Sequence, residues 1–334
     1  MTPAAAEAAV PAQPLIVVGA LTRRRPDLFS RLLASLERMD IPKGVRVAFC
    51  FAENDAGLTI GGMVEDFAEK RGLPATAVLE TRPGIPFGRN AVLDAALGQG
   101  ADHLAFVDDD EEVATDWLVK LYDYHLETGA DLTGGPDFPI EPTEPLTAAQ
   151  RMCFNGLSAR CQRMAESNQR LELQGHGHKA PTVVTSNWLA KLEFLRETGL
   201  RFDEGLGLSG GSDTAFFRAL RQAGGQTAWT AEAKVYEHIP LSRLSAGYQF
   251  RRGRDQSISS FRIRYGDKRG PKLIAKSAFF VLVKTILGTL RLIAALFNGG
   301  SSYVLALRAF GFAYGRILAL LGHHSRHYKT THGG

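Results

Sequence analysis

The sequence contains little cysteine, no basic stretch before an apolar one at its beginning, and no uninterrupted apolar run of about 20 residues. Its three cysteines are Cys50, Cys153 and Cys161, an odd number without Cys-x-x-Cys spacing. This argues against a disulfide scaffold or a zinc knuckle and favours a reducing cytosol. Residues 1–14, rich in Ala and Pro, lack the features of a signal peptide. We expect them to form a disordered leader.

Charge is unevenly distributed along the chain. The 334 residues carry a formal net charge of +4. From Ile239 to the end, however, sixteen Lys and Arg residues accompany two acidic ones, Asp255 and Asp267, which leaves the preceding part acidic. A basic tail of this kind favours an anionic surface as partner. Because Arg251–Arg269 lacks closely interleaved aromatic residues, we expect a phospholipid surface and no nucleic acid.

The basic tail is also strongly apolar between Leu273 and Leu321. Lys276, Lys284 and Arg291 are spaced to share one side of a helix, and an Asn-Gly-Gly sequence at Asn298 indicates a turn. Residues 241–334 are therefore predicted to form a basic helical region with two amphipathic helices lying in the plane of a membrane. The alternative is a helical hairpin packed on the core or on a second copy of the chain. A membrane-spanning helix is not expected.

Strand-like and helix-like segments alternate in the preceding part of the chain. This alternation predicts an α/β fold whose mostly parallel sheet is flanked by helices. Ligands of such sheets bind at the carboxyl ends of the strands. The expected segments are, in order, Leu15–Ala20, Pro26–Met39, Val45–Ala52, Met63–Arg71, Ala75–Glu80, Asn90–Leu97, Leu104–Val107 and Trp117–Leu126.

Five consecutive acidic residues, Asp108 to Glu112, follow the apolar strand that ends at Val107. We call these five residues the acidic segment. Carboxylates this close repel one another unless a cation is present, and a hard divalent cation such as Mg²⁺ or Mn²⁺ prefers oxygen ligands. A solvated acidic turn before the next helix is the alternative. The position directly after a buried parallel strand favours a metal site.

Two further polar segments lie before predicted helices. Arg82 and Arg89 flank a glycine turn and are suited to phosphate contacts, although they would equally pair with the acidic residues. Ser212 and Asp213 follow two glycines at the start of a helix. A residue in this position is usually a helix cap, and the local sequence favours that interpretation for one of them; the alternative is that Asp213 is a general base.

Taken in order, these segments resemble family 2 glycosyltransferases of the GT-A fold over about Leu15–His238. Phe106-Val107-Asp108-Asp109-Asp110 is similar to the metal-binding DxD motif of that family, and Gly211-Ser212-Asp213 parallels a segment whose final Asp is the base. The resemblance implies a GT-A catalytic domain over residues 15–240, with Asp213 as the base and Asp108, Asp110 and His238 at a Mn²⁺ or Mg²⁺ ion. It assigns contacts with the nucleotide sugar to Thr22, Arg24, Glu53, Asp55, Arg82, Arg89, Asn90, Asp108 and Asp109, and contacts with the donor sugar or acceptor to Ser186, Asn187 and Ser212.

The implied activity is the inverting transfer of one sugar from a nucleotide sugar, expected to be UDP-linked. The segments Ser209–Phe217 and Val235–Pro240 resemble bacterial exopolysaccharide transferases of the succinoglycan type. Gln249-x-x-Arg252 lacks the Trp of the processive synthases, which favours a single addition. Together with the basic tail, this predicts a lipid-linked saccharide acceptor at the cytoplasmic face of the inner membrane, and an oligomer formed through the C-terminal helices as an option.

Two other functions fit parts of the pattern. Ser212 stands where the family has Glu, which is compatible with a non-catalytic membrane-surface module that binds nucleotide sugars. Asp108-x-Asp110 also fits the nucleophile and acid of a HAD-type phosphatase. That class, however, places its pair on the first strand, whereas this pair follows the fourth predicted strand.

Overall fold

The computed structural model describes residues 13–175, 181–183, 186–207, 211–266 and 270–323. A mixed sheet forms its centre, in the order β3-β2-β1-β4-β8-β6-β9. Neighbours among the first four of these strands are parallel, and β8 runs antiparallel between β4 and β6. The strands are β1 (Leu15–Thr22), β2 (Arg46–Glu53), β3 (Ala75–Leu79), β4 (His103–Asp108), β6 (Leu132–Gly134), β8 (Asn187–Lys191) and β9 (Thr227–Trp229).

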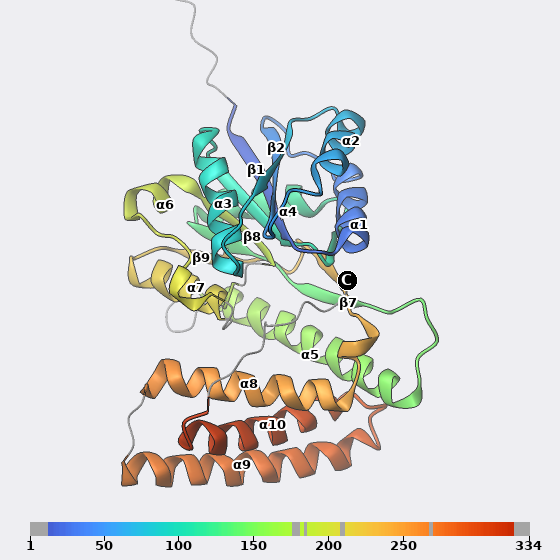
Figure 1. The fold of residues 1–334 in the computed structure, drawn as a ribbon, viewed down its shortest axis with the longest axis vertical. Coiled ribbons are helices and arrows are strands. Elements are labelled where there is room, and N and C mark those ends of the chain that lie inside the picture. Colours follow the sequence, from blue (N-terminus) through green and yellow to red (C-terminus); the bar gives the residue numbers. More distant parts are fainter. Residues whose placement is uncertain (1–12, 176–180, 184–185, 208–210, 267–269, 324–334) are drawn as a thin grey trace, which may run out of the picture.

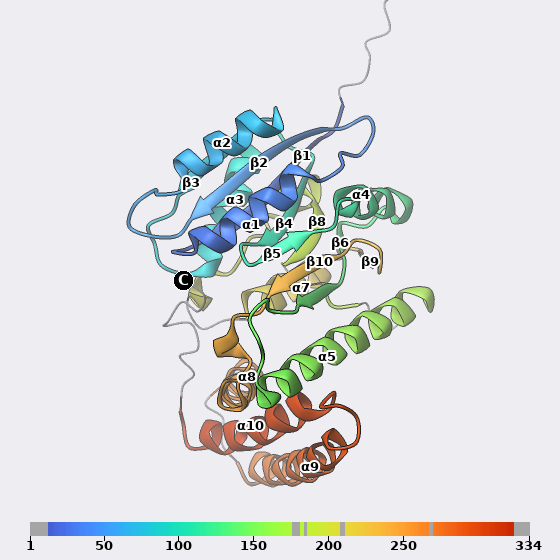
Figure 2. The same cartoon turned by 90° about the vertical axis from the view of Figure 1, so that its right-hand side faces the viewer.

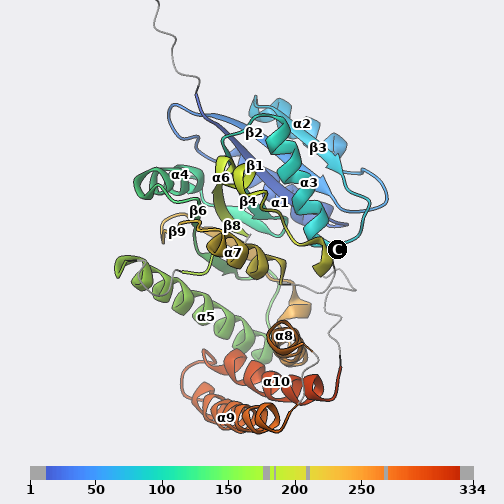
Figure 3. The same ribbon diagram turned by 90° about the vertical axis from the view of Figure 1, so that its left-hand side faces the viewer.

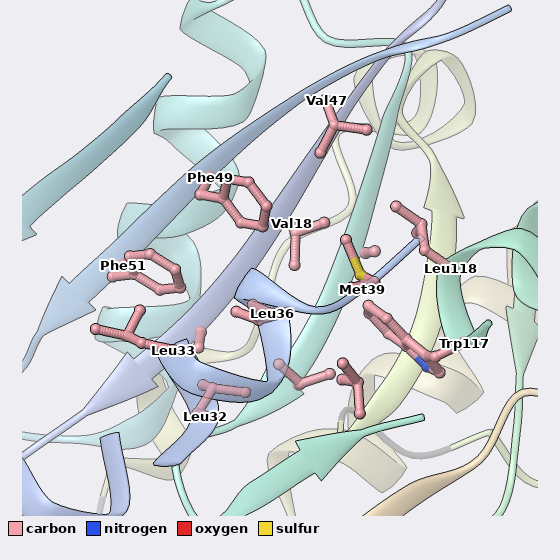
Figure 4. Packing of buried hydrophobic residues seen from close by; sticks show 14 of the residues in the cluster. Val18, Leu32, Leu33, Leu36, Met39, Val47, Phe49, Phe51, Trp117 and Leu118 are labelled. Atoms are coloured by element: carbon pink, nitrogen blue, oxygen red, sulfur yellow. The ribbon is translucent and has the colours of Figure 1, made fainter. Parts of the chain in front are cut away.

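Helices cover both faces of this sheet because its central strands are apolar on both sides (Figures 1 and 3). Val18 packs on one face with side chains of α1 and α4, including Leu36 and Trp117 (Figure 4). Val17 points to the other face, which α3, α6 and α7 cover. The helices are α1 (Pro26–Glu37), α2 (Gly61–Arg71), α3 (Ile85–Gly98), α4 (Trp117–Thr128), α6 (Leu192–Thr198) and α7 (Ser212–Gln222).

A small second sheet lies beside the carboxyl end of β4. It consists of β5 (Glu111–Val113), β10 (Val235–His238) and β7 (Asp137–Ile140), with β10 in the middle. Glu237 is paired with Glu111 across β10 and β5. The second sheet therefore brings residues more than 120 positions apart next to the acidic segment, which the sequence pattern did not predict.

The C-terminal region forms a layer of helices below the sheet (Figures 1 and 2). It contains α8 (Ala246–Tyr265), α9 (Pro271–Ala295) and α10 (Tyr303–Leu320), with α5 (Ala148–Leu173) between it and the sheet. Helix α10 packs against α8 and α9, and α9 lies farthest from the sheet. The two apolar helices are joined at the expected turn after Asn298.

The expectation that the tail holds no segment long enough to span a membrane is wrong in terms of length and composition. Both α9, with 25 residues, and α10, with 18, are long and apolar enough to cross one. The expectation rested on the cations that interrupt the apolar sequence. One of them, Lys284, packs its amine over the rings of Phe280 and Phe312 and so lies within an apolar surrounding.

The large apolar side chains of helix α9 are exposed and point away from the neighbouring helices. Its inner face contains the buried small residues Ser277, Gly288 and Ala295. Gly288 faces the ring of Phe310 so closely that an added Cβ would lie 2.8 Å from it. The exposed face carries large apolar side chains, namely Ile274, Phe279, Leu282, Ile286, Leu290, Ile293, Leu296 and Phe297. This polarity is the reverse of that of a helix on the surface of a water-soluble domain.

Candidate active site

The carboxyl ends of β1, β2 and β4 meet at one edge of the sheet. Thr22 is paired with Glu53, and Leu21 is paired with Asp108. Parallel strands in register end together, so the polar residues that follow them are neighbours in space. Thr22 Oγ1 donates to Asp109 Oδ2 over 2.8 Å in a buried position.

Arg89 joins the acidic segment to the start of α7. Its Nη2 donates to Asp108 Oδ1 over 3.3 Å, and its Nη1 donates to Ser212 Oγ over 3.2 Å and to Asp213. The side chain is buried, with its guanidinium over the rings of Phe106 and Phe202. Arg89 thus contacts both Asp108, the carboxylate expected to bind the metal, and Asp213, the carboxylate expected to act as the base.

Asp109 and Asp110 are held by two other arginines. Arg25 Nη1 lies 3.0 Å from Asp109 Oδ1 and 3.3 Å from Asp110 Oδ2. Arg243 Nη1 lies 3.5 Å from Asp110 Oδ2 and 2.9 Å from Glu237 Oε1. Asp109 and Asp110 are therefore buried and paired, which argues against the alternative of a solvated acidic turn.

Burial disfavours the ionised forms of Asp108 and Asp109. It raises the pKa of Asp108, an effect that Arg89 opposes and that the charges of Asp110 and Asp213 strengthen. It likewise raises the pKa of Asp109 to about 7, together with the charge of Asp110. A nearby cation would stabilise the ionised forms of these carboxylates, since it would neutralise the repulsion between their negative charges.

Asn54 organises the loop that carries the predicted nucleotide contacts. Its Nδ2 donates to the carbonyl oxygens of Glu80 and Arg82, and its Oδ1 accepts from Gly84 N over 2.9 Å. Gly84 has φ of 143°, a conformation that only glycine adopts readily. The side chain of Arg82 pairs with Glu80 and Glu204 at the surface.

Arg24 and Asp55 form a two-contact ion pair near this edge, with Arg24 Nη2 2.8 Å from Asp55 Oδ1. The hydrogen bonds from Arg24 and Ala56 N lower the pKa of Asp55 to about 2. Asp55 is therefore a fixed negative charge at neutral pH, and Arg24 remains largely exposed.

Three of the residues expected at the substrate have side chains that serve the fold. Glu53 accepts from Thr59 and from Ile60 N at the start of α2. Asn90 is bonded to the backbone of Phe202. Asn187 accepts from Trp117 Nε1 and donates to the carbonyls of Pro136 and Ala233. All three are buried.

The cap expected at Ser212 or Asp213 is not formed by either residue. Gly211, with φ of 91°, is the N-cap of α7, and no side chain caps that end. Ser212 and Asp213 lie in the first turn, where Arg89 contacts both. Ser186 is partly exposed directly before β8, next to Asn187.

The ring of His238 is directed to Glu112 and Arg31. Its Nε2 lies 2.6 Å from Glu112 Oε1, and its Nδ1 lies 3.1 Å from Arg31 Nη1. Its backbone N donates to the Asp110 carbonyl over 2.7 Å. The structure thus places His238 beside the acidic segment through its backbone, with its side chain on Glu112 rather than on Asp108 or Asp110.

Sequence reasoning missed Asn54, Arg25, Arg243 and Glu237. Arg25 stands in the expected Thr22–Pro26 turn, and Asn54 stands between two predicted contacts, so position alone offered a signal for both. Arg243 and Glu237 reach the acidic segment only through the second sheet and the short helix Leu241–Arg243.

Comparison with known proteins bears on the family and the fold of this chain. Residues 61–199 match the sequence profile of the family described as Glycosyl transferase family 2. The chain is 32% identical over 263 residues to the succinoglycan biosynthesis protein ExoM of Rhizobium meliloti (strain 1021), which covers 79% of this chain and 76% of that protein.

Two solved structures are similar in fold. Mannosyltransferase PcManGT from Pyrobaculum calidifontis, in complex with GDP-Man and Mn²⁺, matches 92% of this chain and 87% of its own with a TM-score of 0.58 and 15% identity. TarS 1–349 of S. aureus, in complex with UDP-GlcNAc, matches 92% of both chains with a TM-score of 0.50 and 14% identity. These likenesses confirm the predicted GT-A-like α/β fold with added C-terminal helices. By its identity to ExoM over most of both chains, this protein belongs to glycosyltransferase family 2.

Proposed function

We propose that this enzyme transfers one sugar, with inversion, from a UDP-sugar to a lipid-linked saccharide during exopolysaccharide assembly. The bridge that Arg89 makes between Asp108 and Asp213 carries the proposal, because it sets a donor-side carboxylate beside a candidate base. The relationship to a succinoglycan biosynthesis protein supports a role in exopolysaccharide assembly. Binding of UDP-GlcNAc by TarS, which is similar in fold, supports the class of donor.

The residues present fit a Mg²⁺ or Mn²⁺ ion. Asp108 and Asp110 offer only oxygen donors, and the raised pKa of the half-buried Asp108 indicates that a nearby cation would stabilise its ionised form. Among the described residues no group of three His, Cys, Asp or Glu side chains is arranged to hold a metal ion. A site with one or two carboxylates that is completed by substrate phosphates is typical of Mg²⁺. PcManGT, which is similar in fold, binds Mn²⁺.

In the proposed mechanism Asp213 removes the proton from the acceptor hydroxyl as that oxygen attacks the anomeric carbon. Arg89 fixes the orientation of Asp213 through direct contact with its carboxylate. Asp108 and Asp110 would hold the metal ion, which would supply positive charge to neutralise the departing diphosphate. A single displacement from the opposite face inverts the configuration.

The nucleotide is proposed to lie along the ends of β1 and β2. Thr22 and Arg24 on one side, with Asp55 and Arg82 on the other, border this edge. Glu53 and Asn90 contribute by holding the backbone here, since their side chains are occupied within the protein. Ser186 and Ser212 remain candidates for contacts with the sugar or the acceptor.

A membrane surface is the proposed partner of α9, at the cytoplasmic face of the inner membrane. The outward side chains of α9 are apolar, whereas Lys272 and Lys276 are exposed at its start. A helix lying in the interface buries such an apolar face and keeps its cations near anionic headgroups. We take residues 241–323 as this membrane-associated region and residues 15–240 as the catalytic domain; a second copy of the chain is the competing partner for the same face.

Replacing Asp213 by Asn tests the proposed reaction. We expect transfer from radiolabelled UDP-sugars to bacterial membrane extracts to fall by a factor of about 10² to 10⁴, with donor binding unchanged. Asp94→Asn is the control, since the side chain of Asp94 forms a surface ion pair with Arg201. Near-normal transfer by Asp213→Asn would disprove the base. Failure of the wild-type enzyme to transfer or hydrolyse any UDP-sugar with Mn²⁺ would favour a binding module.

Replacing Ile286 by Asp tests the membrane partner. We expect sedimentation with anionic lipid vesicles to be lost, while Leu126→Asp, at an exposed leucine of α4, leaves it unchanged. Analytical ultracentrifugation of the same variants separates the two partners. Conversion of a dimer to a monomer, without vesicle binding by the wild-type chain, would show that α9 is a subunit interface.

A further inference from the structure

The start of α10 and the turn before it contact the first half of α5, and this contact lies close to two arginines. Asn155 Nδ2 donates to the carbonyl of Gly299 over 2.8 Å. One position on, Gly156 contacts Val304 so closely that an added Cβ would lie 2.8 Å from its side chain. Four residues further along each helix stand Arg160 and Arg308. Residues four apart share a helix face, and the charge of Arg160 acts on Arg308, so the two arginines face the same region.

A third arginine comes from α8. Gly253 lies against the backbone of Arg308, where an added Cβ would be 2.6 Å from the Arg308 carbonyl oxygen. Arg252 directly precedes this contact, and its Nη1 donates to the hydroxyl of Tyr248 over 3.3 Å. We call Arg160, Arg252 and Arg308 the arginine cluster.

The arginine cluster has an excess of positive charge. Arg308 is 8% exposed, and within the described ranges its guanidinium has one protein acceptor, Gln249 Oε1 at 2.9 Å. Burial, with the charges of Arg160 and Arg252, lowers the pKa of Arg308 to about 9, so it remains charged at neutral pH. No described carboxylate lies within 4.0 Å of the side-chain nitrogens of Arg160 or Arg308.

Two carboxylates in the neighbourhood do not neutralise the arginine cluster. Burial lowers the pKa of Arg160, and the charges of Asp137 and Glu237 oppose this shift, which shows that they face the same region. Glu237, however, is paired with Arg243 at 2.9 Å. An anion from outside the chain would therefore find, on Arg160 and Arg308, guanidinium groups that no described carboxylate pairs with.

A chain of contacts connects the arginine cluster to the acidic segment. Arg243 contacts Asp110 at 3.5 Å, and the Arg243 carbonyl accepts from Gln249 Nε2 over 2.8 Å. Gln249, which is buried, in turn accepts from Arg308. The cluster belongs to helices that lie between the catalytic sheet and the outward apolar helix α9 (Figure 2).

We propose that the arginine cluster binds the phosphate or diphosphate group of a membrane amphiphile. Guanidinium groups recognise phosphate oxygens through paired hydrogen bonds, and three of them from separate helices match a dianion. The position between the sheet and α9 suits a molecule whose hydrocarbon part lies in the membrane. Two sources share this chemistry, namely the diphosphate of a lipid-linked acceptor and the headgroup of an anionic phospholipid. The proposal rests on the membrane location and lipid-linked acceptor of the proposed function.

Titration of the full chain with geranyl diphosphate tests the proposal. EDTA in the buffer removes divalent cations, so that the probe does not bind through a metal at Asp108. We expect Arg160→Gln to weaken binding by about tenfold or more, since one charged hydrogen-bond donor is lost. Arg170→Gln is the matched control, because Arg170 is an exposed cation on the same helix, and its affinity should equal that of the wild type.

A second pair of variants distinguishes loss of binding from loss of folding. Arg308→Lys keeps the buried charge and is expected to fold and to retain more binding than Arg308→Gln. A thermal unfolding curve of each variant confirms its fold. Equal affinity for geranyl diphosphate and equal vesicle binding in the wild type, Arg160→Gln and Arg308→Gln would overturn the proposal.

Vesicles distinguish the two sources of phosphate. If the site takes a phospholipid headgroup, Arg160→Gln will weaken sedimentation with phosphatidylglycerol vesicles relative to phosphatidylcholine vesicles. If it takes the acceptor diphosphate, Arg160→Gln will weaken geranyl diphosphate binding and leave the vesicle difference unchanged. Neither measurement involves sugar transfer, so loss of the proposed reaction in other experiments would not be mistaken for loss of this site.

Discussion

The guanidinium of Arg89 lies 3.3 Å from the carboxylate of Asp108 and at the same time contacts Asp213. Asp108 ends β4, whereas Asp213 stands in the first turn of α7, more than a hundred residues later. One buried cation therefore couples the proposed metal ligand to the proposed base. The spacing and orientation of these two carboxylates depend on a side chain that itself performs no proton transfer.

Arg89→Lys is expected to lower kcat by about 10- to 100-fold and to change the KM for the donor little. Lysine keeps the charge, but its single ammonium lacks the fork that reaches both carboxylates at once. Steady-state kinetics with varied donor concentration measures the two parameters separately. A KM that rises strongly while kcat is unchanged would instead place Arg89 in donor binding alone.

Asp110→Asn is expected to weaken Mn²⁺ binding in the presence of UDP by about tenfold or more, because one anionic oxygen ligand is lost. Electron paramagnetic resonance of free Mn²⁺ measures this directly. EDTA should abolish transfer by the wild-type enzyme, and added Mn²⁺ or Mg²⁺ should restore it. Mn²⁺ affinity equal to that of the wild type would remove Asp110 from the metal site.

Asn187→Ala is expected to destabilise the protein by about 3 kcal/mol, because it leaves Trp117 Nε1 and two buried carbonyls without partners. Urea unfolding measures the loss. Asn155→Ala, which removes one exposed hydrogen bond, should cost about 1 kcal/mol or less. If Asn187→Ala keeps its stability but raises the KM for the donor, the residue contacts the sugar after all.

Acid is expected to destabilise the fold through His125. Burial lowers the pKa of His125 to about 3, while an unfolded histidine has its usual value of about 6.5. Between these values only the unfolded state binds the proton, so stability is full above about pH 6.5 and falls by about 1.4 kcal/mol per pH unit below it. At pH 5 the loss is about 2 kcal/mol.

His125→Gln should remove this part of the pH dependence. The amide of Gln can keep a hydrogen bond to Thr133, which His125 contacts at 2.9 Å, but it does not titrate. Urea unfolding at pH 7.5 and pH 5 compares the variant with the wild type. The same difference between the two pH values in both proteins would show that His125 does not cause the acid sensitivity; the nearby His103, whose pKa burial also lowers, is the next candidate.

The core sheet and the acidic segment were predictable because both depend on local patterns. Strand β4 is an apolar run that ends in carboxylates, and this order alone places Asp108 at a sheet edge. The antiparallel pairing of β8 with β4 and the second sheet around β10 were not predictable, since both join segments that are distant in the sequence. The expected membrane helices were predicted as elements, but their length was underestimated, because the pattern gave no sign that Lys284 packs inward on Phe312.

Residue types and their order in the sequence determined by themselves that this chain forms an α/β sheet with carboxylates after β4, and that a basic, apolar tail follows. Only the tertiary structure decided which of the expected polar side chains are already occupied by partners within the fold. Glu53, Asn90 and Asn187 have the same chemistry as a binding residue, but their burial requires partners within the protein, and the fold supplies them. Arg89 and Arg308 acquire their roles from helices packed together in three dimensions, because the energy of a buried charge depends on what lies beside it.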